Sequence, residues 1–132
     1  MEEKRIGRRI DWNENFKIRT RRNASIKHEV IKLMIVLKIL EKYKSNHYWI
    51  RIYTEYKVGD KICDIYFENI KTNEIICYEI QKNVTTQWIE ETKKSYENYE
   101  VPFFKTDWTL VRENDLPDEI KSLESEIKKL II

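Results

Sequence analysis

Three polar side chains interrupt two short apolar runs of the chain: Asp64 lies within 61–68, and Glu79 and Gln81 lie within 74–82. Both runs have the composition of strands, and the polar segment 69–73 between them predicts a hairpin turn. Side chains of a strand alternate between its two faces, so Glu79 and Gln81 share a face, and Asp64 joins them if the two faces coincide. Mg²⁺ prefers a few carboxylates plus water, so two acids at the rim of a sheet would suit a metal and phosphate site.

These residues also have structural interpretations. An unpaired buried carboxylate is costly, which makes Asp64 in an apolar strand hard to explain without a function. Glu79 and Gln81 could instead form a solvent-facing polar pair at the end of an edge strand. Glu55 and Glu68 fit ordinary surface acids better than site residues.

A basic segment begins the chain. Residues 1–24 contain eight Lys and Arg against four Asp and Glu, a net charge of +4, whereas the remaining residues carry −2. A basic arm on a near-neutral body predicts a phosphate-binding surface, and a solvated, frayed terminus is the structural alternative. We expect five arginines of this arm to contact nucleic acid: Arg8, Arg9, Arg19, Arg21 and Arg22.

A helix is predicted from its N-cap Ser25 to about Lys44. Apolar residues form two stripes at helical spacing, so this helix should be buried between the sheet and another layer. Glu29 begins a stripe that is otherwise apolar and therefore points at the core, next to His28. The structural alternative is a first-turn acid that the helix dipole favours, and His28 is more typical of a capping or rim residue than of a catalytic one.

The remaining elements follow from composition and turn signals. They are a strand at 47–56, the two hairpin strands, a helix at about 87–99, a strand at 108–112 and a last helix opened by Pro117. The last strand follows a helical crossover, so it can lie parallel to an earlier strand. The predicted fold class is α/β, with a mixed four-stranded sheet flanked by helices, as one domain over 25–132 behind the basic arm 1–24.

Composition limits the class of protein further. No apolar run reaches the length of a membrane span, and the charged N-terminus lacks a signal core, so we expect a cytoplasmic protein without a membrane partner. Cys63 should face away from Asp64, while Cys77 shares the face of Glu79. We therefore expect two buried, reduced thiols that point apart, and no zinc site.

The order of the elements and their acids resembles the PD-(D/E)xK phosphodiesterase superfamily, which includes restriction endonucleases and archaeal Holliday-junction resolvases. The residues that carry the resemblance are an acid on the first helix, Glu29, the strand residue Asp64, and the Glu-x-Gln motif at 79–81. The resemblance covers about residues 25–112 and implies a restriction-endonuclease-like αβββαβ core. It also implies that Asp64, Glu79, the Ile80 backbone carbonyl and Glu29 bind Mg²⁺ or Mn²⁺.

The sequence departs from this family where a lysine is usual, because Gln81 stands there. Glutamine can donate and accept hydrogen bonds but carries no charge. Alternation turns the next residue, Lys82, to the opposite face, so Lys94 on the following helix is our candidate for the missing lysine. The catalytic set implied by the resemblance is thus Asp64, Glu79, Gln81, Glu29 and Lys94.

The resemblance implies a metal-dependent DNA endonuclease, with branched or single-stranded DNA among its candidate substrates. Resolvase-like members often work as dimers, so a homodimer is expected by analogy. Gln81 keeps a different class open: a nuclease fold without catalysis that binds DNA or assembles complexes. A third class is a structural or protein-interaction domain in which Asp64 and Glu79 lie well apart.

Overall fold

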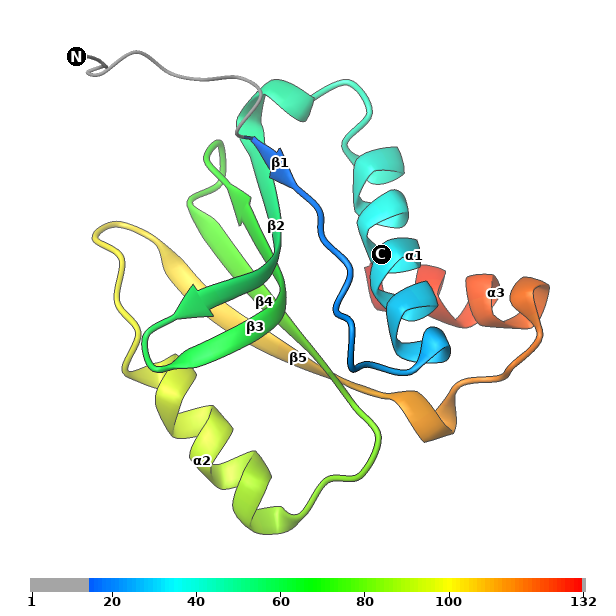
Figure 1. Ribbon diagram of the computed structural model, residues 1–132. Coiled ribbons are helices and arrows are strands. Elements are labelled where there is room, and N and C mark those ends of the chain that lie inside the picture. The colour runs from blue at the N-terminus through cyan, green and yellow to red at the C-terminus, as the bar shows by residue number, and fades with distance from the viewer. Residues whose placement is uncertain (1–14, 132) are drawn as a thin grey trace.

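Five strands form one mixed sheet in the computed structural model, which describes residues 15–131 (Figure 1). They are β1 (Phe16–Lys17), β2 (Ile50–Val58), β3 (Lys61–Asn69), β4 (Glu74–Gln81) and β5 (Lys105–Arg112). The strands lie in chain order: β3 is antiparallel to both β2 and β4, β1 is parallel to β2, and β5 is parallel to β4. The predicted α/β class with a mixed sheet is confirmed, although the sheet has five strands because β1 adds an edge to the predicted four.

Helix α1 (Ile26–Lys42) begins where its sequence predicts. The Ser25 hydroxyl oxygen accepts a hydrogen bond from the His28 backbone N–H at 3.0 Å, which satisfies one of the free donors of the first turn. One face of α1 lies against the sheet, and another packs on α3 (Ile120–Ile131) (Figure 1). Pro117 does not open α3 as predicted, because the helix begins three residues later.

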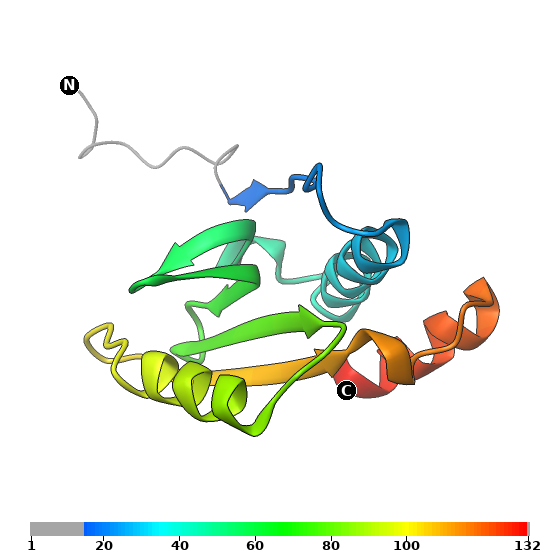
Figure 2. The ribbon, with the colours of Figure 1, turned by 60° about the horizontal axis from the view of Figure 1, so that its bottom comes forward.

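Helix α2 (Thr86–Glu97) lies on the other side of the sheet and forms the crossover from β4 to β5 (Figure 2). Its N-cap is Thr85, whose hydroxyl accepts from the Trp88 backbone N–H at 3.0 Å. Two short 3-10 turns complete the described fold: η2 (His47–Trp49) takes the start of the predicted strand at 47–56, and η3 (Glu113–Asp115) follows β5.

The sheet separates two apolar cores. The larger core joins α1 and α3 to one face through residues such as Ile35, Ile65 and Ile127. The smaller core lies on the α2 side and includes Tyr96, Cys63 and Cys77. None of the helices within 15–131 combines the length and the apolar character that crossing a membrane requires.

Candidate functional site

A local distortion of β2 and β3 determines where the site forms. Glu55 has a φ of +53°, a left-handed conformation that is uncommon for a residue with a side chain. The ladder pairs Thr54 with Ile65 and Tyr56 with Cys63, and Glu55 lies between these two pairs, opposite Asp64. Side-chain alternation is interrupted at this point, although each strand has one residue between the two pairs.

The change of direction is visible in the side chains on both strands. Tyr53 and Tyr56 both contact the ring of Tyr66 on the α2 side, although they are three positions apart and regular alternation would place them on opposite faces. On the α1 side, the Glu55 carboxylate receives the Lys32 ammonium at 3.0 Å. Asp64 likewise turns toward α1. Regular alternation from Tyr53 and Tyr66 would instead place both Glu55 and Asp64 on the α2 side.

Asp64 is 2% exposed and is held by two elements. Its Oδ2 accepts a hydrogen bond from the Ile80 backbone N–H at 2.7 Å, and its Oδ1 lies 3.3 Å from His28 Nε2. The ladder between β3 and β4 ends at the pair Ile65 and Tyr78, so Asp64 and Glu79 are the first residues beyond it. The Asp64 side chain therefore takes the donor that the ladder leaves free where the strands separate.

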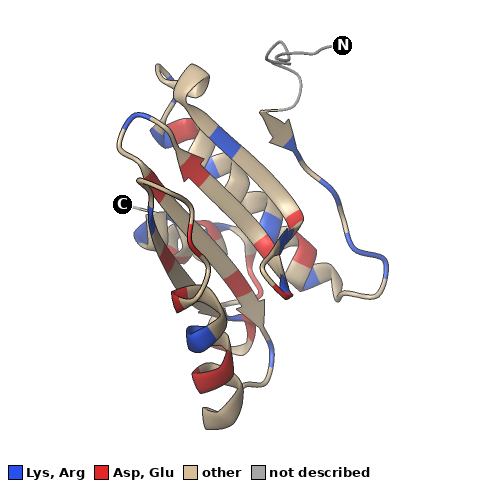
Figure 3. Cartoon of the chain, turned by 90° about the vertical axis from the view of Figure 1, so that its left-hand side faces the viewer, with Lys and Arg blue, Asp and Glu red and all other residues tan. Residues whose placement is uncertain are grey.

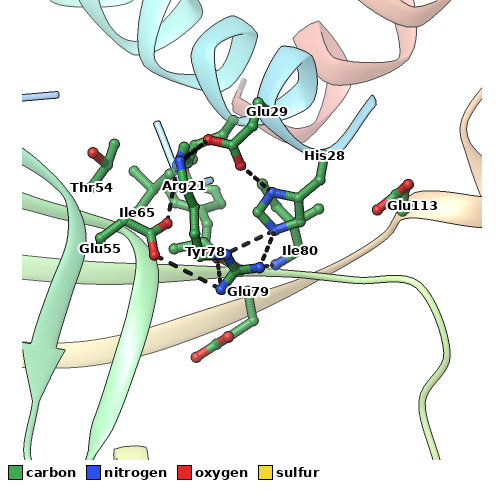
Figure 4. A network of polar contacts seen from close by, with 12 residues as sticks. Arg21, His28, Glu29, Thr54, Glu55, Ile65, Tyr78, Glu79, Ile80 and Glu113 are labelled. Carbon is green, nitrogen blue, oxygen red and sulfur yellow. Dashed lines mark hydrogen bonds and ion pairs between the residues drawn. The ribbon is translucent and has the colours of Figure 1, made fainter. Parts of the chain in front are cut away.

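Six charged or titratable side chains surround this point and form what we call the charged cluster (Figure 4). Its members are Arg21, His28, Glu29, Lys32, Glu55 and Asp64. Lys32 Nζ lies 2.7 Å from Glu29 Oε1 as well as 3.0 Å from Glu55 Oε2, and it is fully buried. Buried charges require partners, and here three carboxylates face one Lys, one Arg and one His.

His28 connects α1 to the strand acid. Its Nδ1 lies 2.6 Å from Glu29 Oε2 while its Nε2 faces Asp64, so each ring nitrogen has a carboxylate partner. Burial tends to lower the pKa of His28, but its hydrogen bonds with Asp64 and Glu29 outweigh this effect and raise the pKa above its usual value. For Glu29, burial raises the pKa, but Lys32 and the Arg21 N–H together lower it below its usual value.

Arg21 is the cluster member that reaches solvent. Its side chain is 47% exposed, and its guanidinium lies 3.8 Å from Glu55 and 3.9 Å from Asp64. Its backbone N–H donates to Glu29 Oε1 at 2.6 Å. The segment between β1 and α1 that carries Arg21 is basic, as Figure 3 shows. A residue predicted to bind nucleic acid thus also contacts the predicted site acid.

Glu79 belongs to a separate network on the α2 side. Its carboxylate accepts a hydrogen bond from the Tyr96 hydroxyl, and Figure 4 shows its side chain leaving β4 away from His28 and Glu29. Burial raises the pKa of Glu79 to about 7; hydrogen bonds from Tyr96 and Gln81 oppose the rise and the charge of Asp64 adds to it. The predicted convergence of Asp64, Glu79 and Gln81 on one side is therefore wrong for Asp64, while Glu79 and Gln81 remain together.

The other predicted site residues have different positions. Lys94 is exposed on α2, and Tyr96 is the α2 residue that reaches Glu79. Lys82 follows the last residue of β4, Gln81, and both residues line one pocket. Among the predicted nucleic-acid contacts, Arg19 and Arg22 are exposed, whereas Arg8 and Arg9 lie outside the described residues.

The expected separation of the thiols is also wrong. Cys63 and Cys77 are both free, fully buried and members of the α2-side core, and they interact with each other. Burial, followed by the neighbouring Cys77, raises the pKa of Cys63 well above its usual value. Cys63 does face away from Asp64, but alternation is interrupted between Asp64 and Ile65, and Cys63 therefore lies on the face of Cys77.

Lys32 and Glu55 are the cluster members that reasoning from sequence missed. Lys32 carried a signal, because its spacing of three from Glu29 on a helix places the two side chains on one face. Glu55 carried none, since nothing in its neighbourhood in sequence predicts a left-handed conformation in a strand.

The donors at the strand separation suit a hard divalent cation. Asp64 and Glu79 offer carboxylate oxygens, which are the ligand type that Mg²⁺ and Mn²⁺ prefer. Within 15–131, however, no three His, Cys, Asp or Glu side chains converge into an ion site, and Glu79 is bound to Tyr96. The carboxylates suit such an ion by their chemistry, but Asp64 turns to the α1 side and Glu79 to the α2 side. The two could hold one ion only if Glu79 left Tyr96 and turned toward Asp64.

No family model, no curated protein and no solved structure matches the chain.

Proposed function

We propose that the chain is a metal-dependent endonuclease built on a restriction-endonuclease-like αβββαβ core. The order α1, β2, β3, β4, α2, β5, with three antiparallel strands and a fourth parallel to the third, supports this assignment. The helix acid Glu29, the strand acid Asp64 and the Glu-x-Gln motif lie on the elements that the resemblance requires.

One observation carries the proposal: Asp64 is a buried carboxylate at the separation of β3 and β4, bonded to the backbone of Ile80. A buried charge network lowers stability unless every partner is well placed, so a structural role alone explains it poorly. Perturbed titratable groups gathered at one edge of a sheet are typical of functional sites.

Four residues of the cluster then have a role in the proposed reaction. Mg²⁺ or Mn²⁺ held by Asp64, Glu79 and the Ile80 carbonyl would supply phosphate polarisation and a nucleophilic water. Arg21 is placed to bind a phosphate oxygen from the solvent side. His28, oriented by Glu29, holds a proton beside Asp64, and together with Arg21 it brings positive charge to the site where Gln81 replaces the usual lysine.

The test is cleavage of plasmid, single-stranded and branched DNA with Mg²⁺ or Mn²⁺. We expect cleavage by the wild type, loss of it in Asp64→Asn, and full retention in the control Glu90→Gln, which alters an exposed acid of α2. Circular dichroism establishes that both variants are folded. Activity that persists in folded Asp64→Asn contradicts the site assignment.

A second candidate is a nuclease-fold domain that binds nucleic acid without cleaving it. Gln81 favours it, and so does the charged cluster, in which cationic side chains already neutralise Asp64. This candidate predicts nucleic-acid binding that weakens with salt, no cleavage with any metal, and no calorimetric signal for Mn²⁺ that depends on Asp64.

A further inference from the structure

A pocket opens beside the charged cluster, beyond the end of β4. It encloses about 440 Å³, which is within the range of small-ligand sites. Arg21 and His28 contribute to both the pocket and the cluster, and Ile80, whose N–H holds Asp64, also lines the pocket. A group bound in this pocket would therefore lie next to Asp64.

The pocket presents cations whose backbones are held in place. Arg21 and Lys82 come from different segments, and both are exposed at the pocket. The Arg21 backbone N–H is bonded to Glu29, and the Lys82 carbonyl accepts from Asn114 Nδ2 at 3.0 Å. Two cations whose backbones are held by hydrogen bonds are suited to bind a phosphate, because little conformational freedom of the backbone is lost on binding.

The other lining groups are polar and small. Asn23, Ser25 and Gln81 supply amide and hydroxyl groups, and no Phe, Tyr or Trp contributes to the lining. The ring of His28 lines the pocket, but it is 4% exposed and both of its nitrogens face carboxylates. One acid is present, Glu113, which is 4% exposed. Its Oε2 accepts a hydrogen bond from the Ser25 hydroxyl, with 2.9 Å between the two oxygens. Base recognition on single strands uses aromatic stacking, whereas cations, hydroxyls and amides contact phosphate and sugar.

We propose that this pocket binds the sugar–phosphate backbone of a nucleic-acid strand, with the phosphate at Arg21 and Lys82 and without reading the base. The identity of the ligand as a nucleic acid rests on the proposed function. The pocket then selects the strand by its backbone, and cleavage at Asp64 is independent of base sequence.

The test measures binding alone, in EDTA, by fluorescence anisotropy. The probes are a labelled thymidine oligonucleotide of about ten residues and an abasic strand with the same number of phosphates. We expect equal affinity for both probes, about tenfold weaker binding in Arg21→Gln and in Lys82→Gln, and a salt dependence reduced by about one phosphate contact in each. The matched control Lys71→Gln, at an exposed lysine in the turn between β3 and β4, should bind like the wild type.

Two results overturn the proposal. One is an abasic strand that binds more than about tenfold more weakly than the thymidine strand, which would show that bases are read. The other is wild-type affinity in both Arg21→Gln and Lys82→Gln. Since no metal is present, equal probe binding that depends on Arg21 and Lys82, together with an absence of cleavage in Mg²⁺, would refute the endonuclease and leave the backbone-binding pocket standing.

Discussion

The carboxylate of Asp64 accepts the backbone N–H of Ile80 at 2.7 Å, immediately beyond the last paired residues of β3 and β4. A side chain thus replaces a backbone acceptor in the ladder and joins two strands where they separate. This bond fixes one oxygen of Asp64 and leaves the other facing His28 and Arg21. Four predictions follow from this arrangement and its surroundings, beside the cleavage and binding tests above.

Lys32→Met should destabilise the fold strongly. The substitution keeps the apolar stem but removes the ammonium group between Glu29 and Glu55, leaving two mostly buried carboxylates without their main cation. Breaking a buried ion pair on one side costs about 3 kcal/mol. Urea denaturation measures the loss, and Lys129→Met, which removes an exposed pair with Glu126, should change little. Equal effects in the two variants would mean that the buried network contributes no more than a surface pair.

Glu79→Gln should alter how stability depends on pH. The folded-state pKa of Glu79 is about 7 against an ordinary value of 4.5, so the folded protein binds this proton more tightly than the unfolded chain. The associated stability is present below pH 4.5 and is lost as pH rises through 7. Glutamine does not titrate, so the variant should melt a few degrees higher than the wild type at pH 8, with no such gain at pH 4.5.

Thermal melts across this pH range measure the effect on Glu79→Gln, and Glu90→Gln is the control because it removes an exposed acid from α2. A variant whose melting temperature runs parallel to that of the wild type from pH 4.5 to pH 8 would contradict the raised pKa of Glu79.

Ser25→Ala should cost more than Thr85→Ala, although both remove the N-cap of a helix. The Thr85 hydroxyl accepts from the backbone of Trp88, and its loss costs about 1 kcal/mol. The Ser25 hydroxyl accepts from His28 and also donates to the buried Glu113, so its loss costs about 2 kcal/mol. Chemical denaturation of both variants tests the difference, and a Thr85→Ala loss as large as that of Ser25→Ala would remove Glu113 from the explanation.

Gln81→Lys should raise the cleavage rate at least about tenfold, because an ammonium group can stabilise developing negative charge that an amide cannot. The measurement is the initial rate of plasmid cleavage in Mg²⁺. Gln87→Lys adds the same charge at an exposed position of α2 and should leave the rate unchanged. If the wild type is inactive and only Gln81→Lys cleaves, the second candidate function describes the natural protein.

The sequence by itself determined the α/β class, the order of the elements and the start of α1 at Ser25, because these depend on local periodicity, capping and turn composition. It also placed Asp64, Glu79 and Gln81 on adjacent antiparallel strands. It did not predict β1, whose two residues form a strand only by pairing with β2, or the three-residue delay between Pro117 and α3.

Only the tertiary structure decided which acids meet. Alternation holds along a regular strand, and it is interrupted beside the left-handed Glu55 on β2 and beside Asp64 on β3. Asp64 turns to α1 while Glu79 stays on the α2 side. That distortion is accompanied by the ion pair between Glu55 and Lys32, residues 23 apart in the chain. An interaction between distant residues leaves no periodic trace in the sequence, which is why the positions of these acids relative to one another could not be predicted from it.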